Sequence, residues 1–232
     1  MRCVNTRDLG GLATTEGHRT SCGLVVRCAA EQNPVPPVAM HLARTAGAAH
    51  LVDLRESAEV IPDRPEVSGI TVHRHPLNDP AVYRVRTSER DIDYYVEHYI
   101  SMLPAAHRAV GKILQLVSGG GPPVVVACRL GKDRTGVVAM VLLTLLGVTE
   151  EAAVRDFTAT ARWFRSHPQW VRAYAESRGE ETAAVYRRLV LPSSVAVRTL
   201  RHLRGHAAAL RSLTDIDRRS LDGARARLIG GR

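Results

Sequence analysis

Aromatic residues and lysine are both scarce in this sequence. Phe, Trp and Tyr make up 4% of its 232 residues, and 30 of its 32 basic residues are Arg. Without clustered aromatic rings the chain offers no stacking surface for nucleobases, so a nucleic-acid partner is not expected. The two lysines are Lys112 and Lys132. A lysine kept at position 132 suggests that a compact, mobile ammonium group is needed there.

Cysteine is also rare, and its spacing argues against a metal site. The four cysteines are Cys3, Cys22, Cys28 and Cys128. None belongs to a Cys-x-x-Cys pair or has metal-like spacing to a histidine, so neither structural zinc nor any other metal or cofactor is expected. A free, reactive thiol needs reducing conditions, which predicts a cytoplasmic protein.

Long apolar segments are missing as well. Residues 1–5 contain no apolar core of a signal peptide. The longest apolar run, residues 137–148, is interrupted by Thr144 and is too short to cross a bilayer. No transmembrane segment is therefore expected.

Acidic residues are too few to balance the basic ones, and the excess is concentrated at the C-terminal end. The formal net charge is +9, and residues 198–232 contain nine Arg against three Asp. We interpret residues 193–232 as a basic helical extension packed on or near the main domain. A solvated helix face is the simpler explanation of its charge, and weak contact with acidic surfaces is the alternative.

The length and the apolar content fit one α/β domain spanning residues 1–232. Short apolar runs predict strands at residues 23–26, 50–55, 69–73 and 124–127, with a hairpin turn at Glu16-Gly17. Helices are predicted over residues 38–49, over 92–117 with a break near Pro104, twice within 149–190 and twice within 193–229. This alternation indicates a mostly parallel central sheet flanked by helices, with ligand sites beyond the carboxyl ends of its strands.

The most informative segment is residues 128–136, Cys-Arg-Leu-Gly-Lys-Asp-Arg-Thr-Gly, which is followed by an apolar helix from Val137. If this segment curls, its amide N–H groups and the helix N-terminus converge on one point. Such a point suits a phosphate group and lowers the pKa of a thiol placed there. A nucleotide-binding P-loop is excluded, because Lys132 is followed by Asp133 and Val126 takes the position of the first glycine.

Three side chains of this loop have roles that follow from their chemistry. Cys128, as a thiolate, would attack phosphorus and give a phosphocysteine that water then hydrolyses. The planar guanidinium of Arg134 can hold two phosphate oxygens, and Thr135 could donate a hydrogen bond to the sulfur and ease its departure. Further phosphate contacts are expected from Arg129, Leu130, Gly131, Lys132 and Gly136.

The spacing Cys-x5-Arg followed by Thr-Gly resembles the signature of the protein tyrosine phosphatase superfamily. The fuller string Cys-x-x-Gly-Lys-Asp-Arg-Thr-Gly is similar to its bacterial branch of atypical, dual-specificity members. Residues 5–11 (Asn-Thr-Arg-Asp-Leu-Gly-Gly), the strand at 23–27 and Asp53-Leu54-Arg55 with Glu59 extend the resemblance over roughly residues 5–160. It implies the cysteine-dependent phosphatase fold and a metal-independent reaction. One departure is Ala127, where the family usually has a histidine before the nucleophile.

The resemblance also places the general acid, which protonates the leaving oxygen, inside the loop at Asp133. Asp79, in the turn-rich segment Asn78-Asp79-Pro80, is the alternative, by analogy with the separate acid loop of ordinary tyrosine phosphatases. Asp53 is a third candidate, although Asp53 and Arg55 at a strand end are also the pattern of an internal ion pair. Asp53 and Arg55 are included among the expected substrate-binding residues.

The partner is expected to be a phosphate monoester, and two substrate classes fit. Phosphotyrosine and phosphoserine proteins are the class that the superfamily resemblance implies. Small anionic phosphates, such as phosphoinositides, sugar phosphates or nucleotide-like biosynthetic intermediates, are the alternative, because Arg129 and Lys132 resemble the basic pair of phosphoinositide phosphatases. A third hypothesis, favoured by Ala127, is a catalytically silent module that binds a phosphorylated partner.

Overall fold

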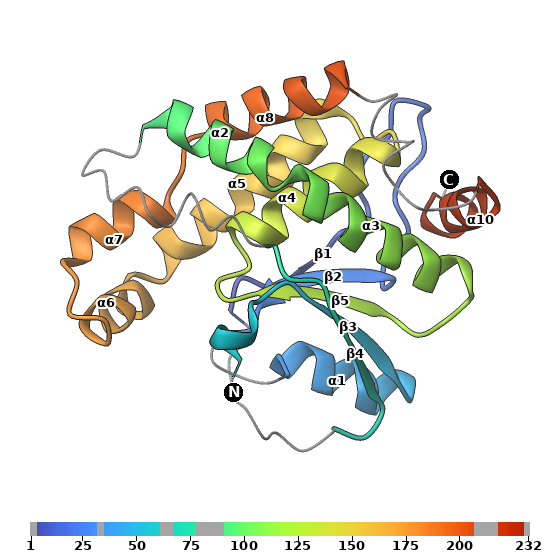
Figure 1. The fold of residues 1–232 in the computed structure, drawn as a ribbon, viewed down its shortest axis with the longest axis horizontal. Coiled ribbons are helices and arrows are strands. Elements are labelled where there is room, and N and C mark those ends of the chain that lie inside the picture. Colours follow the sequence, from blue (N-terminus) through green and yellow to red (C-terminus); the bar gives the residue numbers. More distant parts are fainter. Residues whose placement is uncertain (1–3, 32–34, 61–66, 78–90, 207–217, 230–232) are drawn as a thin grey trace.

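The computed structural model of the chain describes residues 4–31, 35–60, 67–77, 91–206 and 218–229. Its centre is a five-stranded sheet in the order β1-β2-β5-β3-β4 (Figure 1), in which β1 is antiparallel to β2 and the other neighbours are parallel. The strands are β1 (Arg7–Asp8), β2 (Val25–Ala29), β3 (Ala49–Asp53), β4 (Ile70–Arg74) and β5 (Val124–Cys128). The predicted α/β class with a mostly parallel sheet is confirmed.

Helices cover both faces of the sheet, as Figure 1 shows. One face carries α1 (Pro37–Ala46), which packs on β3. The other side carries α3 (Leu103–Ser118), α4 (Asp133–Leu145) and α5 (Glu150–Ser166), together with α2 (Ile92–Ser101), α8 (Ser193–Gly205) and α10 (Arg218–Leu228). Three further elements are η1 (Ser57–Glu59), α6 (Pro168–Glu176) and α7 (Thr182–Leu189).

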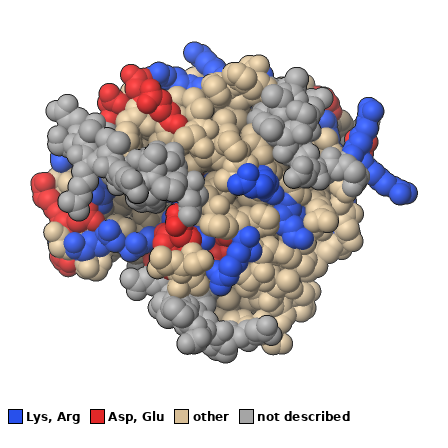
Figure 2. Space-filling view, in the orientation of Figure 1, with Lys and Arg blue, Asp and Glu red and all other residues tan. Residues whose placement is uncertain are grey.

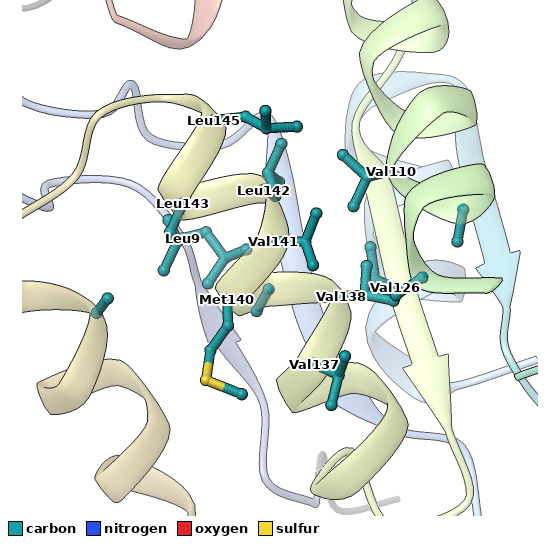
Figure 3. Close-up of a cluster of buried hydrophobic side chains, with 14 of the residues drawn as sticks. Leu9, Val110, Val126, Val137, Val138, Met140, Val141, Leu142, Leu143 and Leu145 are labelled. Carbon is teal, nitrogen blue, oxygen red and sulfur yellow. The ribbon is translucent and has the colours of Figure 1, made fainter. Parts of the chain in front are cut away.

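Burial explains why β5 and α4 lie at the centre of the fold. Every residue of β5 is buried, and so is nearly every residue of α4, which requires an apolar surface on all sides of that helix. In Figure 3, Val141 extends from α4 toward α3 and β5, whereas Met140 extends to the opposite side. The loop that joins β5 to α4 is therefore anchored in the core at both of its ends.

Proline positions decide where two of the helices begin. The break expected near Pro104 is confirmed, because α2 ends at Ser101 and α3 begins at Leu103 with Pro104 in its first turn. The prediction of two helices within residues 149–190 is wrong, since this segment forms α5, α6 and α7. Pro168 explains the first break, because it lacks the N–H that would continue α5 and occupies the first position of α6. The second break, between α6 and α7, contains Gly179 with a φ of 62°.

The C-terminal helices contribute to the same core as the sheet. Leu200 of α8 and Leu228 of α10 belong to the cluster of buried side chains that includes β5 and α4. Arg227 of α10 also donates a hydrogen bond of 2.7 Å to the carbonyl oxygen of Val117 in α3. On the face shown in Figure 2, Lys and Arg side chains lie in several separate places and not in one patch. Within the described part of the chain, no helix combines the length and apolar character needed to cross a membrane.

Candidate active site

The loop of residues 129–132 leaves the sheet at the carboxyl end of its central strand. β5 lies between β2 and β3, with Cys128 in register with Ala29, and α4 begins at Asp133. Cys128 is buried, with 2% of its surface exposed. A thiol that is followed by a short loop and a helix N-terminus is the arrangement predicted for a nucleophile in a phosphate cradle.

The backbone of the loop is shaped by Gly131, which has a φ of 61°. A Cβ at this position would lie 2.5 Å from the carbonyl group of Cys28, so conformation and space both require glycine. Asn5 donates from Nδ2 to the carbonyl oxygens of Leu130 and Gly131, each at 3.0 Å. Because the C=O and N–H of a trans peptide point in opposite directions, the N–H groups of Gly131 and Lys132 face away from Asn5, as an anion cradle requires.

A buried ion cluster holds the loop from behind. Arg27 donates to the carbonyl oxygen of Gly131 at 2.9 Å and pairs with Asp156, which also binds Arg7 at 2.6 Å. Burial alone would raise the pKa of Asp156, but the charges of Arg27 and Arg7 lower it. Burial lowers the pKa of Arg7 to about 10; Arg27 adds to this effect and Asp156 opposes it. Asp156 therefore supplies the negative charge that keeps two arginines beneath the loop.

Replacing Asp156 with Asn is expected to destabilise the protein at pH 7 by about 3–5 kcal/mol, because it leaves the buried Arg27 without its counter-ion. The difference in the free energy of unfolding between the wild type and the Asp156→Asn protein should become smaller at acid pH. Since the folded pKa of Asp156 lies below its unfolded value, its stabilising effect is complete above about pH 4 and disappears as the pH falls through the folded pKa. Urea unfolding at several pH values measures both effects.

The matched control for this change is Asp93→Asn. Asp93 pairs with Arg198 at the surface, where the two side chains are 64% and 49% exposed, so less than about 1 kcal/mol should be lost. Equal destabilisation by Asp156→Asn and Asp93→Asn would contradict the supporting role of the buried cluster.

The guanidinium of Arg134 is fixed by Glu59 of η1. Its two terminal nitrogens bind the two carboxylate oxygens, with NH2 at 2.7 Å from Oε1, and 8% of Arg134 is exposed. Burial alone would raise the pKa of Glu59. The hydrogen bonds and the positive charge of Arg134 lower that pKa below its ordinary value, and the charge of Arg129 lowers it further. Such a bidentate pair sets the plane of the guanidinium. Sequence reasoning placed Glu59 within a motif but missed its contact with Arg134, 75 residues away.

Asp133 is held through one of its oxygens by two neighbours. The ammonium of Lys132 forms an ion pair with Oδ1 of Asp133 and lies 5.2 Å from the ring centre of Tyr95. Tyr99 donates from its hydroxyl to the same oxygen at 2.6 Å. Burial alone would raise the pKa of Asp133, but Lys132 and Tyr99 lower it. Sequence reasoning missed Tyr99, for which the four-residue spacing from Tyr95 on a predicted helix was the available signal.

Asp53 and Arg55 are paired with each other at the end of β3. The guanidinium of Arg55 donates to the two oxygens of Asp53 at 2.9 and 2.8 Å, and each residue is 1% exposed. Arg74 lies 3.5 Å from the same carboxylate. This is the internal ion pair that the Asp-x-Arg pattern allowed, and a contact of either residue with substrate stays a prediction. Asp79, the alternative acid, lies outside the described residues.

Two further residues of the predicted phosphate site, Thr135 of α4 and Leu130 of the loop, pack against other parts of the protein. Thr135 is fully buried, and its hydroxyl has no hydrogen-bond partner within the described residues. The expected bond from Thr135 to the sulfur of Cys128 is therefore not formed in this structure. Leu130 packs against a hydrophobic cluster that includes Phe164 of α5 and Trp170 of α6, so these helices enclose the loop on its outer side.

Comparison with known proteins gives the family to which the chain belongs. The model of the tyrosine phosphatase family matches residues 1–227, and the chain belongs to that family. A protein of Cupriavidus necator, provisionally described as a tyrosine-protein phosphatase, is 29% identical over 163 residues. The aligned region is 66% of this chain and 59% of that protein, so the chain covers less than two thirds of its relative's length.

Proposed function

We propose that the protein hydrolyses phosphate monoesters through a covalent phosphocysteine, with Cys128 as the nucleophile and Arg134 as the phosphate ligand, and with no metal ion in the reaction. The observation that carries the proposal is the site around the start of α4. It combines the buried thiol of Cys128 with the guanidinium of Arg134, which Glu59 orients. Between them lies a loop whose carbonyl groups accept hydrogen bonds from Asn5, so that its N–H groups face the other way. Membership of the tyrosine phosphatase family supports the same reaction.

The proposed reaction has two steps. In the first, the thiolate of Cys128 attacks phosphorus, the S–P bond forms as the ester P–O bond breaks, and the leaving oxygen takes a proton from Asp133. In the second, water attacks the phosphocysteine, Asp133 accepts a proton from that water, and the S–P bond breaks to release phosphate and the thiolate. Arg134, the loop amides and the N-terminus of α4 stabilise the charge on the phosphoryl oxygens in both steps.

Protonation of Asp133 is coupled to substrate binding in this mechanism. An acid must carry its proton before the first step, whereas Lys132 and Tyr99 favour the ionised carboxylate. A phosphate dianion in the loop competes for the ammonium of Lys132 and brings negative charge near Asp133. Both changes raise the pKa of Asp133. Lys132 thus neutralises charge on the substrate and, by leaving Asp133, allows that carboxylate to take up the proton it needs.

The substrate is proposed to be a phosphotyrosine or phosphoserine protein, and a small anionic phosphate is the second candidate. Lys132, which is buried, and Arg129 belong to the same loop and favour the second candidate, because two cations can bind charge beyond one phosphate group. A phosphate-release assay with phosphopeptides, phosphoinositides, sugar phosphates and nucleotides tests the proposal. Release from none of them, together with measurable phosphate binding, would favour a binding module over an enzyme.

Asp133→Asn is expected to slow the hydrolysis of alkyl phosphates on the order of 100- to 1000-fold, because the poor leaving group then departs without a proton. Aryl phosphates with good leaving groups, such as p-nitrophenyl phosphate, should be affected much less. The measurement is kcat for both substrate types, with Asp93→Asn as the surface control. An equal loss on both types would place the general acid at another residue.

A further inference from the structure

The hydroxyl of Tyr99 is placed to control one oxygen of the proposed acid. Tyr99 belongs to α2, is fully buried and donates to Oδ1 of Asp133 at 2.6 Å. Its ring lies at an angle against the rings of Tyr95 and Phe157, with centres 6.3 and 6.0 Å away. These contacts leave the ring little freedom to rotate, so the hydroxyl keeps its position relative to α4.

Tyr99 and Lys132 both donate to Oδ1 of Asp133, but the two donors differ in charge and in mobility. Burial and the charge of Asp133 raise the pKa of Tyr99 well above its ordinary value, so the phenol remains a donor throughout the neutral range. Lys132 carries its ammonium on a flexible chain with three rotatable donors, which suits exchange between a carboxylate and a phosphate. When Lys132 turns to a substrate, Tyr99 is the donor that stays on Oδ1.

We propose, on the basis of the function proposed above, that Tyr99 is a positioning residue for proton transfer: it occupies Oδ1 of Asp133, so that the transferred proton is carried by Oδ2. In the first step the O–H bond at Oδ2 breaks as the leaving oxygen gains the proton and the ester P–O bond breaks. In the second step Oδ2 takes a proton from the attacking water. Oδ1 accepts the hydrogen bond from Tyr99 whether Asp133 is ionised or protonated, because a carboxylic acid with its proton on Oδ2 can still accept at Oδ1.

Tyr99→Phe tests the proposal, since it removes one oxygen atom and keeps the buried ring. For alkyl phosphates, kcat should fall about 10- to 100-fold with little change in KM, the cost of losing a hydrogen bond to a charged group. For p-nitrophenyl phosphate the loss should be small. The loss of a donor to the carboxylate should also raise the pKa of Asp133, so the alkaline limb of the kcat profile should move to higher pH. The carboxyl resonance of Asp133, followed by carbon-13 NMR, should titrate at higher pH too.

Tyr174→Phe on α6 is the matched control, because Tyr174 stacks on Trp170 and is not a contact of Asp133. It should change none of these readouts, and thermal unfolding checks that both variants remain folded. A Tyr99→Phe protein with wild-type pH profile, NMR titration and leaving-group dependence would overturn the positioning role while leaving the phosphatase reaction intact. Absence of Cys128-dependent turnover in the wild type would overturn the reaction and the positioning role together.

Discussion

Replacing Cys128 with Ser is expected to reduce phosphate release by a factor on the order of 100,000 or more, the cost of removing a catalytic nucleophile. The hydroxyl of serine ionises far less readily than a thiol, so the loop amides and the helix N-terminus cannot convert it to an anion at neutral pH. Binding of phosphate esters should persist, because Arg134 and the loop backbone are unchanged. Steady-state phosphate release and substrate binding by calorimetry measure the two effects separately.

The covalent intermediate provides a second, independent readout. Wild-type protein quenched in acid during turnover should carry a phosphoryl group on Cys128, detectable by mass spectrometry, and the Cys128→Ser protein should not. Cys22→Ser is the control, because Cys22 is an exposed free thiol and its loss should leave turnover unchanged. Persistent turnover in the Cys128→Ser protein would contradict the assignment of Cys128 as the nucleophile.

The second large effect is expected for Arg134→Lys, which keeps the positive charge but removes the planar set of N–H donors of the guanidinium. Turnover should fall on the order of 100- to 1000-fold, with kcat affected more than KM, because one ammonium cannot hold two equatorial oxygens in the transition state. The change also removes the bidentate contact with Glu59, so the remaining cation is less well oriented. Steady-state kinetics on one aryl and one alkyl phosphate measure the loss.

Arg155→Lys is the control for this change. Arg155 pairs with Glu151 on the exposed side of α5, where an Arg-to-Lys exchange keeps a similar surface interaction. Its kinetic constants should equal those of the wild type. An Arg134→Lys protein with kinetic constants equally close to the wild type would show that phosphate is held by other groups.

The fold was predictable where the sequence pattern is local. The apolar run at residues 124–127 and the apolar helix after Val137 indicated β5 and α4 without reference to distant residues, and Pro104 marked the break between α2 and α3. The segment 149–190 was harder, because its helical spacing continues on both sides of Pro168. The number of helices there depends on how α6 and α7 pack against α5, which spacing alone does not specify.

The same distinction applies to the site. Cys128, Asp133 and Arg134 could be named because they share one contiguous loop. Their partners come from elsewhere: Glu59 is 75 residues from Arg134, and Tyr99 is 34 residues from Asp133. The place of Glu59 in a motif and the four-residue spacing of Tyr99 from Tyr95 are signals for these residues but not for their partners, since the fold alone brings η1 and α2 to the start of α4.

The hydrogen bonds of Asn5 have a consequence for the order in which the protein folds. Asn5 reaches Leu130 and Gly131 across 125 and 126 positions of sequence, and Arg27 reaches Asp156 across 129. Contacts with such long sequence separation form late, because the entropy of closing the intervening loops must be overcome first. On a ribosome, Arg27 can be paired with Asp156 only after α5 has emerged. A nascent chain that has already assembled α4 and β5 would therefore still lack this support beneath the loop.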